Sequence, residues 1–169
     1  IKERHEIKEH EFEELAKILS SFIGSSCNPN KLTNTFKSKV NVDLSYPIVV
    51  KYISYLKDSF LIEEAERYDI KGRKYIGSLS KYYFCDLGVR NSILNFRQQE
   101  ENHIMENVLY NELRMRGYNV DVGMVDVKRK IDGKSIRQQY EVDFVVNEGS
   151  DRYYIQSAFA MPNIEKERQ

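Results

Sequence analysis

Two short apolar runs in the second half of the chain carry polar side chains where a fully buried strand would not normally hold them. Residues 140–146 include Glu141 and Asp143, and residues 153–157 include Gln156. Because alternate residues of a strand point to the same face, Glu141 and Asp143 are predicted to share one face. A buried carboxylate is costly unless a cation, a metal ion or a hydrogen-bond donor meets it. The two runs therefore predict neighbouring strands with a polar site on one face.

A helix is predicted over residues 104–116, with Gly117 as its stop. It carries Glu106, and we expect it to cover the polar face. Strands are predicted over 118–127, 137–146 and 152–158, with a turn over 128–135 and a closing helix from Pro162. Helix, three strands and helix form an α/β core that stops before any final strand.

The first half of the chain has the period of helices. Apolar residues recur at helical spacing from Phe12 to Phe22, after Asn28-Pro29, and from Tyr46 to about Ser59. Short strands are predicted at 60–62, 75–76 and 81–84, around a basic turn at 70–74. Three helices followed by a hairpin is the order of a winged helix. The polar stretch 97–102 divides the chain into a winged-helix module, 1–95, and an α/β domain, 96–169.

Composition restricts the classes of function. The 26 Lys and Arg residues balance the 26 Asp and Glu residues, so any nucleic-acid-binding surface must be local. Cys27 and Cys85 lack metal-type spacing, and no run of about 20 apolar residues predicts a membrane span. We expect a cytoplasmic protein with reduced thiols. The sequence begins inside a charged helical pattern and stops in a new one, so we expect a piece of a longer protein.

Several segments resemble, in order, the C-terminal half of a large group of prokaryotic ATPases. They are residues 23–25 (IGS), 28–32 (NPNKL), 67–72 (RYDIKG), 81–88 (KYYFCDLG), 106–113 (ENVLYNEL), 116–118 (RGY), 120–123 (VDVG), 141–145 (EVDFV) and 154–157 (YIQS). In that family, an AAA+-type P-loop domain precedes a winged helix and a restriction-endonuclease-like domain of unassigned function. The resemblance implies a PD-(D/E)XK-type α-β-β-β-α core here, truncated at its C-terminus. No P-loop pattern occurs in this sequence, so ATP with Mg²⁺ is expected only in a missing N-terminal domain.

The same resemblance implies a catalytic constellation with parts missing. Glu106 would be the helix acid and Asp143 the strand ligand for Mg²⁺, which prefers oxygen ligands. Gln156 stands where a second acid usually sits, and Ala158 replaces the lysine that steadies developing charge. The alternative interpretation is a hydrogen-bonded network in which Asp143 caps a backbone and Gln156 bridges strands. Glu141 is expected to face solvent or to pair with an arginine.

A basic surface is predicted on the winged helix. Lys51 lies on the third helix, and Arg67, Lys71, Arg73 and Lys74 cluster at the wing. Such a surface suits contacts with DNA phosphates, with the third helix in a groove. The first helix is densely acidic and would repel DNA if it lay on the same side; the alternative is a wing that contacts a protein. The sequence leaves DNA contact and protein contact open.

The predicted function is therefore a non-catalytic recognition or regulatory portion of an AAA+-type ATP-binding protein. The alternative is a weak or vestigial Mg²⁺-dependent nuclease using Glu106 and Asp143, which leaves enzymatic activity of this chain open. The partners this implies are DNA, the ATPase domain of the parent protein and a second copy of the chain.

Overall fold

The computed structural model describes residues 7–98, 100–131 and 134–158. These residues form two compact units. Unit 1 contains residues 7–64 and 78–98, and unit 2 contains residues 65–77, 100–131 and 134–158. The sequence placed one boundary between residues 95 and 96. In the structure the chain passes from unit 1 to unit 2 near residue 99. It also enters unit 2 once before that, because residues 65–77, the tip of the predicted wing hairpin, belong to unit 2.

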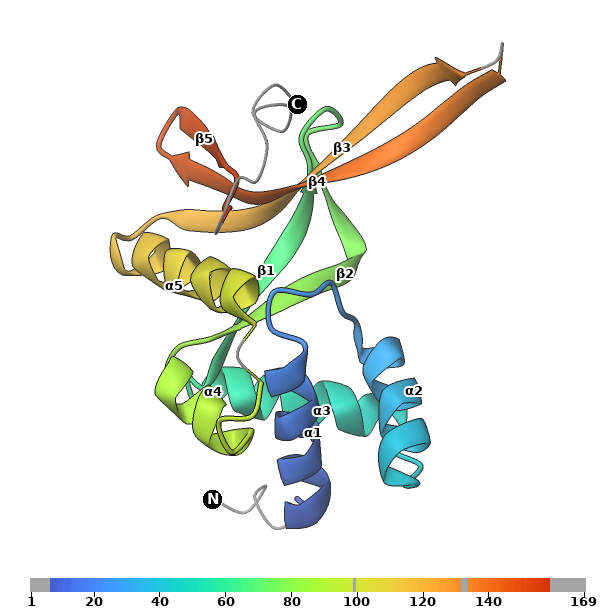
Figure 1. The fold of residues 1–169 in the computed structure, drawn as a ribbon, viewed down its shortest axis with the longest axis vertical. Helices are drawn as coiled ribbons and strands as arrows, with labels where there is room; N and C mark the ends of the chain where they lie inside the picture. The colour runs from blue at the N-terminus through green and yellow to red at the C-terminus, as the bar shows by residue number, and fades with distance from the viewer. Residues whose placement is uncertain (1–6, 99, 132–133, 159–169) are drawn as a thin grey trace. The chain divides into compact units, whose positions relative to one another are not determined.

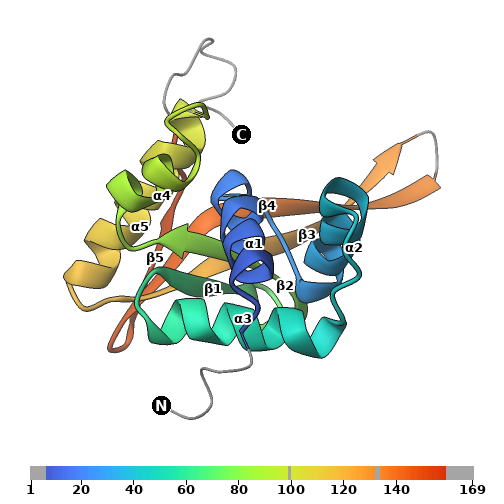
Figure 2. The same ribbon diagram turned by 90° about the horizontal axis from the view of Figure 1, so that it is seen from below.

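Unit 1 is built on three helices that pack against one another (Figures 1 and 2). They are α1 (Glu9–Ser21), α2 (Pro29–Val40) and α3 (Tyr46–Asp58). The Asn28 side chain caps α2 by accepting a hydrogen bond from the backbone N of Lys31 at 2.7 Å, and Pro29 occupies the first turn. The three predicted helices are confirmed. A fourth helix, α4 (Leu87–Ile93), was not predicted; the Asp86 side chain caps it at the backbone N of Gly88 and Val89.

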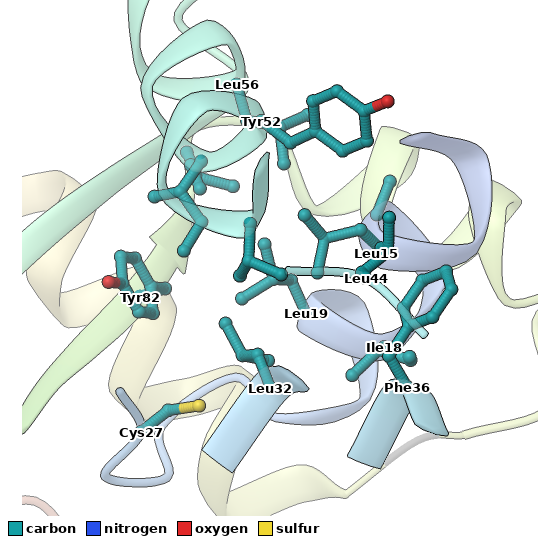
Figure 3. Packing of buried hydrophobic residues seen from close by; sticks show 14 of the residues in the cluster. Leu15, Ile18, Leu19, Cys27, Leu32, Phe36, Leu44, Tyr52, Leu56 and Tyr82 are labelled. Atoms are coloured by element: carbon teal, nitrogen blue, oxygen red, sulfur yellow. The ribbon is translucent and has the colours of Figure 1, made fainter. Parts of the chain in front are cut away.

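The interior of unit 1 is apolar (Figure 3). Leu15 and Leu19 of α1 meet Leu32 and Phe36 of α2, and all four side chains are 0% exposed. Spacing of i, i+4 in both helices puts each pair on one face, as the sequence pattern predicts. The core therefore holds the helices by burial of hydrocarbon surface.

The strands β1 (Ile62–Asp69) and β2 (Lys74–Phe84) follow the helices. The strand predicted at 60–62 is wrong: Phe60 has a φ of 56° and is 80% exposed, so the strand starts two residues later. The segment between α1 and α2 also pairs with this hairpin, through an antiparallel bridge of Cys27 with Ser80. Backbone bonds of 2.8 Å in both directions hold the bridge.

Unit 2 consists of a helix and most of a five-stranded sheet. Its elements are α5 (Glu101–Met115), β3 (Asn119–Ile131), β4 (Lys134–Glu148) and β5 (Asp151–Ile155), together with the tip of the β1–β2 hairpin. The strand order is β2-β1-β3-β4-β5. Strand β1 runs parallel to β3, whereas β4 is antiparallel to both of its neighbours, β3 and β5. The predicted helix with three strands is confirmed. The predicted closing helix from Pro162 lies outside the described residues.

Two expectations about unit 2 are corrected. The parallel pairing of β1 with β3, at Arg67 with Val122, was not expected from a hairpin called a wing. The turn predicted over 128–135 is too long, because residues 128–131 of β3 and 134–135 of β4 are paired strand; residues 132–133 lie outside the described residues. The fold class is mixed α and β, as expected.

Candidate functional site

Asp143 lies where the pairing of β3 with β4 is irregular. The register shifts between Asp121 and Gly123 of β3, so that Val122 alone lies opposite two residues of β4, Asp143 and Phe144. This arrangement is a β-bulge, in which an extra residue alters the alternation of side chains. Bulges redirect side chains and are common beside active sites.

The bulge sends Asp143 and Phe144 to the same face of the sheet. Their neighbours Val142 and Val145 pair with β3 residues that are two apart, so those two valines share the opposite face. The ring of Tyr110, on α5, lies 6.3 Å from the ring of Phe144. The helix α5 therefore packs on the face to which Asp143 points.

The Asp143 carboxylate is held by hydrogen bonds from the two residues that follow β5. Its Oδ2 atom accepts a bond from Gln156 Nε2 at 2.8 Å, from the backbone N of Ser157 at 2.7 Å and from Ser157 Oγ at 2.7 Å. Asp143 is only 8% exposed, and donors of this kind offset the loss of water around a buried carboxylate. The structure thus brings Asp143 and Gln156 together and adds Ser157, which the sequence analysis did not single out.

The buried side of α5 is unusually polar. Glu106 is 6% exposed, Asn107 0% and Tyr110 2%. Because residues three and four apart share a helix face, Glu106 and Asn107 lie on the side that carries Tyr110 toward the sheet. Glu106 is therefore turned into the protein and not toward bulk solvent, as the predicted site requires.

One carboxylate oxygen of Asp143 is committed to hydrogen bonds. A hard cation needs several oxygen ligands with free lone pairs, and Asp143 Oδ2 already accepts three hydrogen bonds. Within the described part of the chain there is no group of three or more His, Cys, Asp or Glu residues that could hold a metal ion. Ala158, which the sequence analysis placed at the position expected for a lysine, is exposed.

Arg67 was predicted to belong to the basic wing, and this is wrong. It is 7% exposed, and its Nη2 atom donates to Met124 Sδ and to Gln139 Oε1, each at 3.0 Å. Its register with Val122 places it on the same face as Asp143, one strand away on the other side of β3. Within the described residues its Nε atom has no hydrogen-bond partner. Only the parallel pairing of β1 with β3 explains this burial, so no local sequence signal reveals it.

Asp121 is a third buried acid of unit 2, on the face of the sheet opposite to that of Asp143. Tyr75 Oη donates to Asp121 Oδ2 at 3.2 Å. Burial raises the pKa of Asp121 above its ordinary value, although the Tyr75 hydrogen bond works against the rise. The interaction joins β3 to the hairpin tip.

The predicted nucleic-acid-binding residues fall in both units. Lys51 lies on α3 in unit 1, with its Nζ 5.8 Å from the centre of the Tyr55 ring. Around it α3 exposes apolar side chains, at Tyr46 (48%), Ile48 (36%) and Val50 (40%). Lys57, also on α3, forms an ion pair with Glu64 at 2.6 Å; despite the opposing effect of burial, this pairing lowers the pKa of Glu64.

Lys71, Arg73 and Lys74 lie at the hairpin tip in unit 2, and all three are exposed. Asp69 shapes this turn by accepting hydrogen bonds from the backbone N of Lys71 and of Gly72, at 3.1 and 2.9 Å. Lys71 Nζ donates to the backbone O of Asp126 on β3 at 3.0 Å. The turn is therefore attached to β3.

Residues 1–100 match the family model DUF8612, described as a domain of unknown function. An uncharacterised protein of Haemophilus influenzae is 33% identical over 144 residues, which are 85% of this chain and 33% of that protein. An uncharacterised protein of Methanocaldococcus jannaschii is 30% identical over 168 residues, which are 99% of this chain and 35% of that protein.

The chain thus spans about a third of the length of these relatives. No solved structure matches it. In the described residues, no helix is both long and apolar enough to cross a membrane.

Proposed function

The chain belongs to the DUF8612 family, and we propose that it is the non-catalytic recognition portion of a longer, AAA+-type ATP-binding protein. In this proposal it binds DNA or a protein partner, while ATP with Mg²⁺ binds an N-terminal domain outside this chain. The ordered sequence motifs support the ATPase assignment, and relatives of about three times this length leave room for such a domain. The proposed location is the cytoplasm.

The hydrogen bonding of Asp143 carries the non-catalytic part of the proposal. Phosphodiester cleavage by a restriction-endonuclease-like site needs carboxylate oxygens on Mg²⁺ and a cation near the developing charge. Here the Gln156 side-chain amide donates a hydrogen bond to Asp143 Oδ2, and Ser157 donates two more to the same oxygen, from its backbone N and its Oγ. Ala158 supplies no cation. The carboxylate therefore acts as an acceptor that fixes the end of β5.

The arrangement of unit 1 supports recognition by a winged helix. Three packed helices precede a hairpin, and a single bridge of Cys27 with Ser80 pairs the segment between α1 and α2 with that hairpin. In such a module the third helix contacts the partner. The exposed Tyr46, Ile48 and Val50 on α3 favour a protein contact for this helix, because aromatic and aliphatic side chains dominate the centre of protein interfaces. The ATPase domain of the same protein and a second copy of the chain are the proposed protein partners.

A cleavage assay tests the proposal. The purified chain is incubated with supercoiled plasmid in Mg²⁺ and, separately, in Mn²⁺, beside an Asp143→Ala variant as the control for contaminating nucleases. We expect the two proteins to give the same background of nicked plasmid. Metal-dependent nicking by the unmodified chain that disappears in Asp143→Ala would refute the non-catalytic assignment.

A weak or vestigial Mg²⁺-dependent nuclease remains the second candidate. The observation that favours it is the burial of two acids, Glu106 and Asp143, on the α5-facing side of the sheet, with Asp143 placed there by a bulge. Because Ala158 is exposed, a lysine at this position can be tolerated without burying a charge. Under this second candidate, Gln156→Glu with Ala158→Lys gains metal-dependent cleavage that a further Glu106→Gln change removes. Continued inactivity of the well-folded double variant counts against it.

A further inference from the structure

The far halves of β3 and β4 form a two-stranded ribbon with an excess of positive charge. Residues 126–131 pair with residues 134–139, from Asp126 opposite Gln139 to Ile131 opposite Lys134. Residues 126–139 contain five basic residues against two acids: Lys128, Arg129, Lys130, Lys134 and Arg137, against Asp126 and Asp132. We call the paired residues 126–131 and 134–139 the basic ribbon (Figure 1).

The basic ribbon is exposed on both faces. Lys128, Arg129 and residues 135–139 are all exposed, including 46% of the apolar Ile136. A two-stranded hairpin by itself is marginally stable in water, since it lacks a covered face. The length and exposure of the basic ribbon therefore indicate that an external partner completes it.

The charges of the ribbon indicate the sign of this partner. Lys128 lies directly opposite Arg137, and like charges in that position repel each other. Asp126 partly compensates, because its carboxylate accepts hydrogen bonds from Arg137 and from Gln139. An anionic partner would relieve the remaining repulsion.

The hairpin tip adds further cations at the base of the ribbon. Lys71 Nζ bonds to the backbone O of Asp126, which attaches the exposed turn of Lys71, Arg73 and Lys74 to the first residue pair of the ribbon. Basic residues thus extend from this turn along the ribbon, all within unit 2.

The dimensions and the distribution of charge match duplex DNA. Six residue pairs at about 3.4 Å each span roughly 20 Å, and a two-stranded ribbon fits the major groove, which is about 12 Å wide. Lys128 and Arg137 lie on one face and Arg129 on the other, so phosphates on both walls of a groove are within their reach. Gln138 shares the face of Arg129, and both residue types can form two hydrogen bonds with a base edge.

We propose that the basic ribbon, residues 126–131 and 134–139, is a duplex-DNA-binding element that enters the major groove, with Lys71, Arg73 and Lys74 contacting the flanking phosphates. The inference does not depend on the winged helix, because the ribbon belongs to β3 and β4 and not to α3. It also does not require any nuclease activity.

The test compares three charge variants of the 169-residue chain. The ribbon variant carries Lys128→Gln, Arg129→Gln and Arg137→Gln. The matched control removes three exposed cations elsewhere, by Lys17→Gln, Lys39→Gln and Arg116→Gln. A third variant, Lys51→Gln with Lys57→Gln, tests α3. Binding to a fluorescein-labelled duplex of about three helical turns is followed by anisotropy over a series of salt concentrations, with the matching single strand as a second probe.

We expect the unmodified chain to prefer the duplex and the ribbon variant to lose most of this binding. Three lost phosphate contacts reduce the log–log salt slope by about 0.9 each. When the salt rises from 50 to 200 mM, the affinity of the unmodified chain should therefore fall by about 40-fold more than that of the ribbon variant. The control should retain the slope of the unmodified chain. Methyl green, which occupies the major groove, should displace the protein, and the minor-groove ligand netropsin should not.

Any of the following results would overturn the proposal: no duplex binding by the unmodified chain at low salt, a preference for the single strand, displacement by netropsin alone, or equal losses in the ribbon variant and the matched control. Loss of binding only in the α3 variant would place DNA on the winged helix and refute the ribbon. Circular dichroism melts of all variants show whether a loss of binding reflects unfolding, and an unfolded ribbon variant is replaced by the single change Lys128→Gln, for which a reduction of about 0.9 in slope is expected.

Discussion

The two units bury their polar side chains in different ways. In unit 1 the buried arginine, Arg90, is 2% exposed and donates to the backbone O of Ser20 at 3.0 Å and of Gln98 at 2.6 Å. In unit 2 the buried arginine, Arg67, bonds to a thioether and an amide, and its Nε atom is unpartnered among the described residues. Arg90 therefore links two backbone segments of unit 1, whereas Arg67 is held in unit 2 by weaker acceptors.

The two cores also differ in the proportion of buried residues that are polar, which is higher in unit 2. Unit 1 surrounds its buried polar residues with a large cluster of apolar side chains from α1, α2 and α3. Unit 2 buries five polar residues beside eight hydrophobic ones in its described part; the polar five are Arg67, Glu106, Asn107, Asp121 and Asp143. Proteins retain buried polar groups where a function or a specific geometry requires them. The difference therefore directs attention to unit 2 for function and to unit 1 for stability.

The largest expected effect is in the core of unit 1. Leu19→Ala removes a side chain that is 0% exposed, and should lower the free energy of unfolding by about 2–5 kcal/mol. Urea denaturation measures the loss, and hydrogen–deuterium exchange of peptides shows whether it is confined to unit 1. Val50→Ala, at a 40% exposed position of α3, is the matched control and should change stability little. A loss below about 1 kcal/mol for Leu19→Ala would contradict a tightly packed core.

The next effect concerns the packing of the sheet in unit 2. A Cβ atom on Gly123 would lie 2.7 Å from Val145 Cγ2 and 2.9 Å from Ile70 Cδ1. Gly123→Ala should therefore lower the free energy of unfolding by up to about 3 kcal/mol through overpacking. Gly77→Ala serves as the control, because no atom lies within 4 Å of the added Cβ there. Equal urea midpoints for the two variants would show that the sheet adjusts to the clash.

A smaller effect separates the two arginines. Arg90→Met removes the donor to the backbone O of the buried Ser20 and the donor to the backbone O of Gln98, and should lower the free energy of unfolding by about 2 kcal/mol. Arg67→Met replaces a poorly partnered cation by an apolar side chain of similar length, and should leave stability unchanged or raise it by about 1 kcal/mol. Thermal melts of both variants measure the contrast. Should Arg67→Met be the more damaging change, the comparison of the two units would be reversed.

The smallest expected effect is the dependence of stability on pH, which has opposite signs in the two units. The pKa of Glu64 in unit 1 is lowered, so its contribution is present above its ordinary value of 4.5 and is lost as the pH falls through the folded value. The pKa of Asp121 in unit 2 is raised above 3.8, so the folded state holds its proton longer and stability declines as the pH rises through that interval. Urea midpoints are measured between about pH 3 and pH 7. The Glu64→Gln variant should no longer show the decline in midpoint toward acid pH, and the Asp121→Asn variant should no longer show the rise in midpoint toward low pH. Unchanged profiles would mean that neither group is coupled to folding.

Local pattern predicted the elements well where one period dominates. The helical spacing of Leu15, Leu19, Leu32 and Phe36 identified the core faces of α1 and α2 correctly. Alternation predicted that Glu141 and Asp143 share a face, and their register with β3 agrees. The short α4 was missed because its seven residues contain too few apolar positions to show a period.

By itself, the sequence determined most of the helices and strands, which faces are apolar, and that Asp143 is a polar group in a buried strand. The buried strand predicted at 153–157 is wrong, because β5 is exposed and ends at Ile155, before the exposed Gln156. The tertiary structure decided the rest. The bulge that turns Asp143 toward α5, the parallel pairing that buries Arg67, and the extension of β3 and β4 into the basic ribbon all depend on partners distant in the chain. Periodicity records which side of an element is apolar, because that information is local. Strand partners and register depend on which segments meet, and a charged run such as 128–130 has the same composition in a turn as in an exposed ribbon.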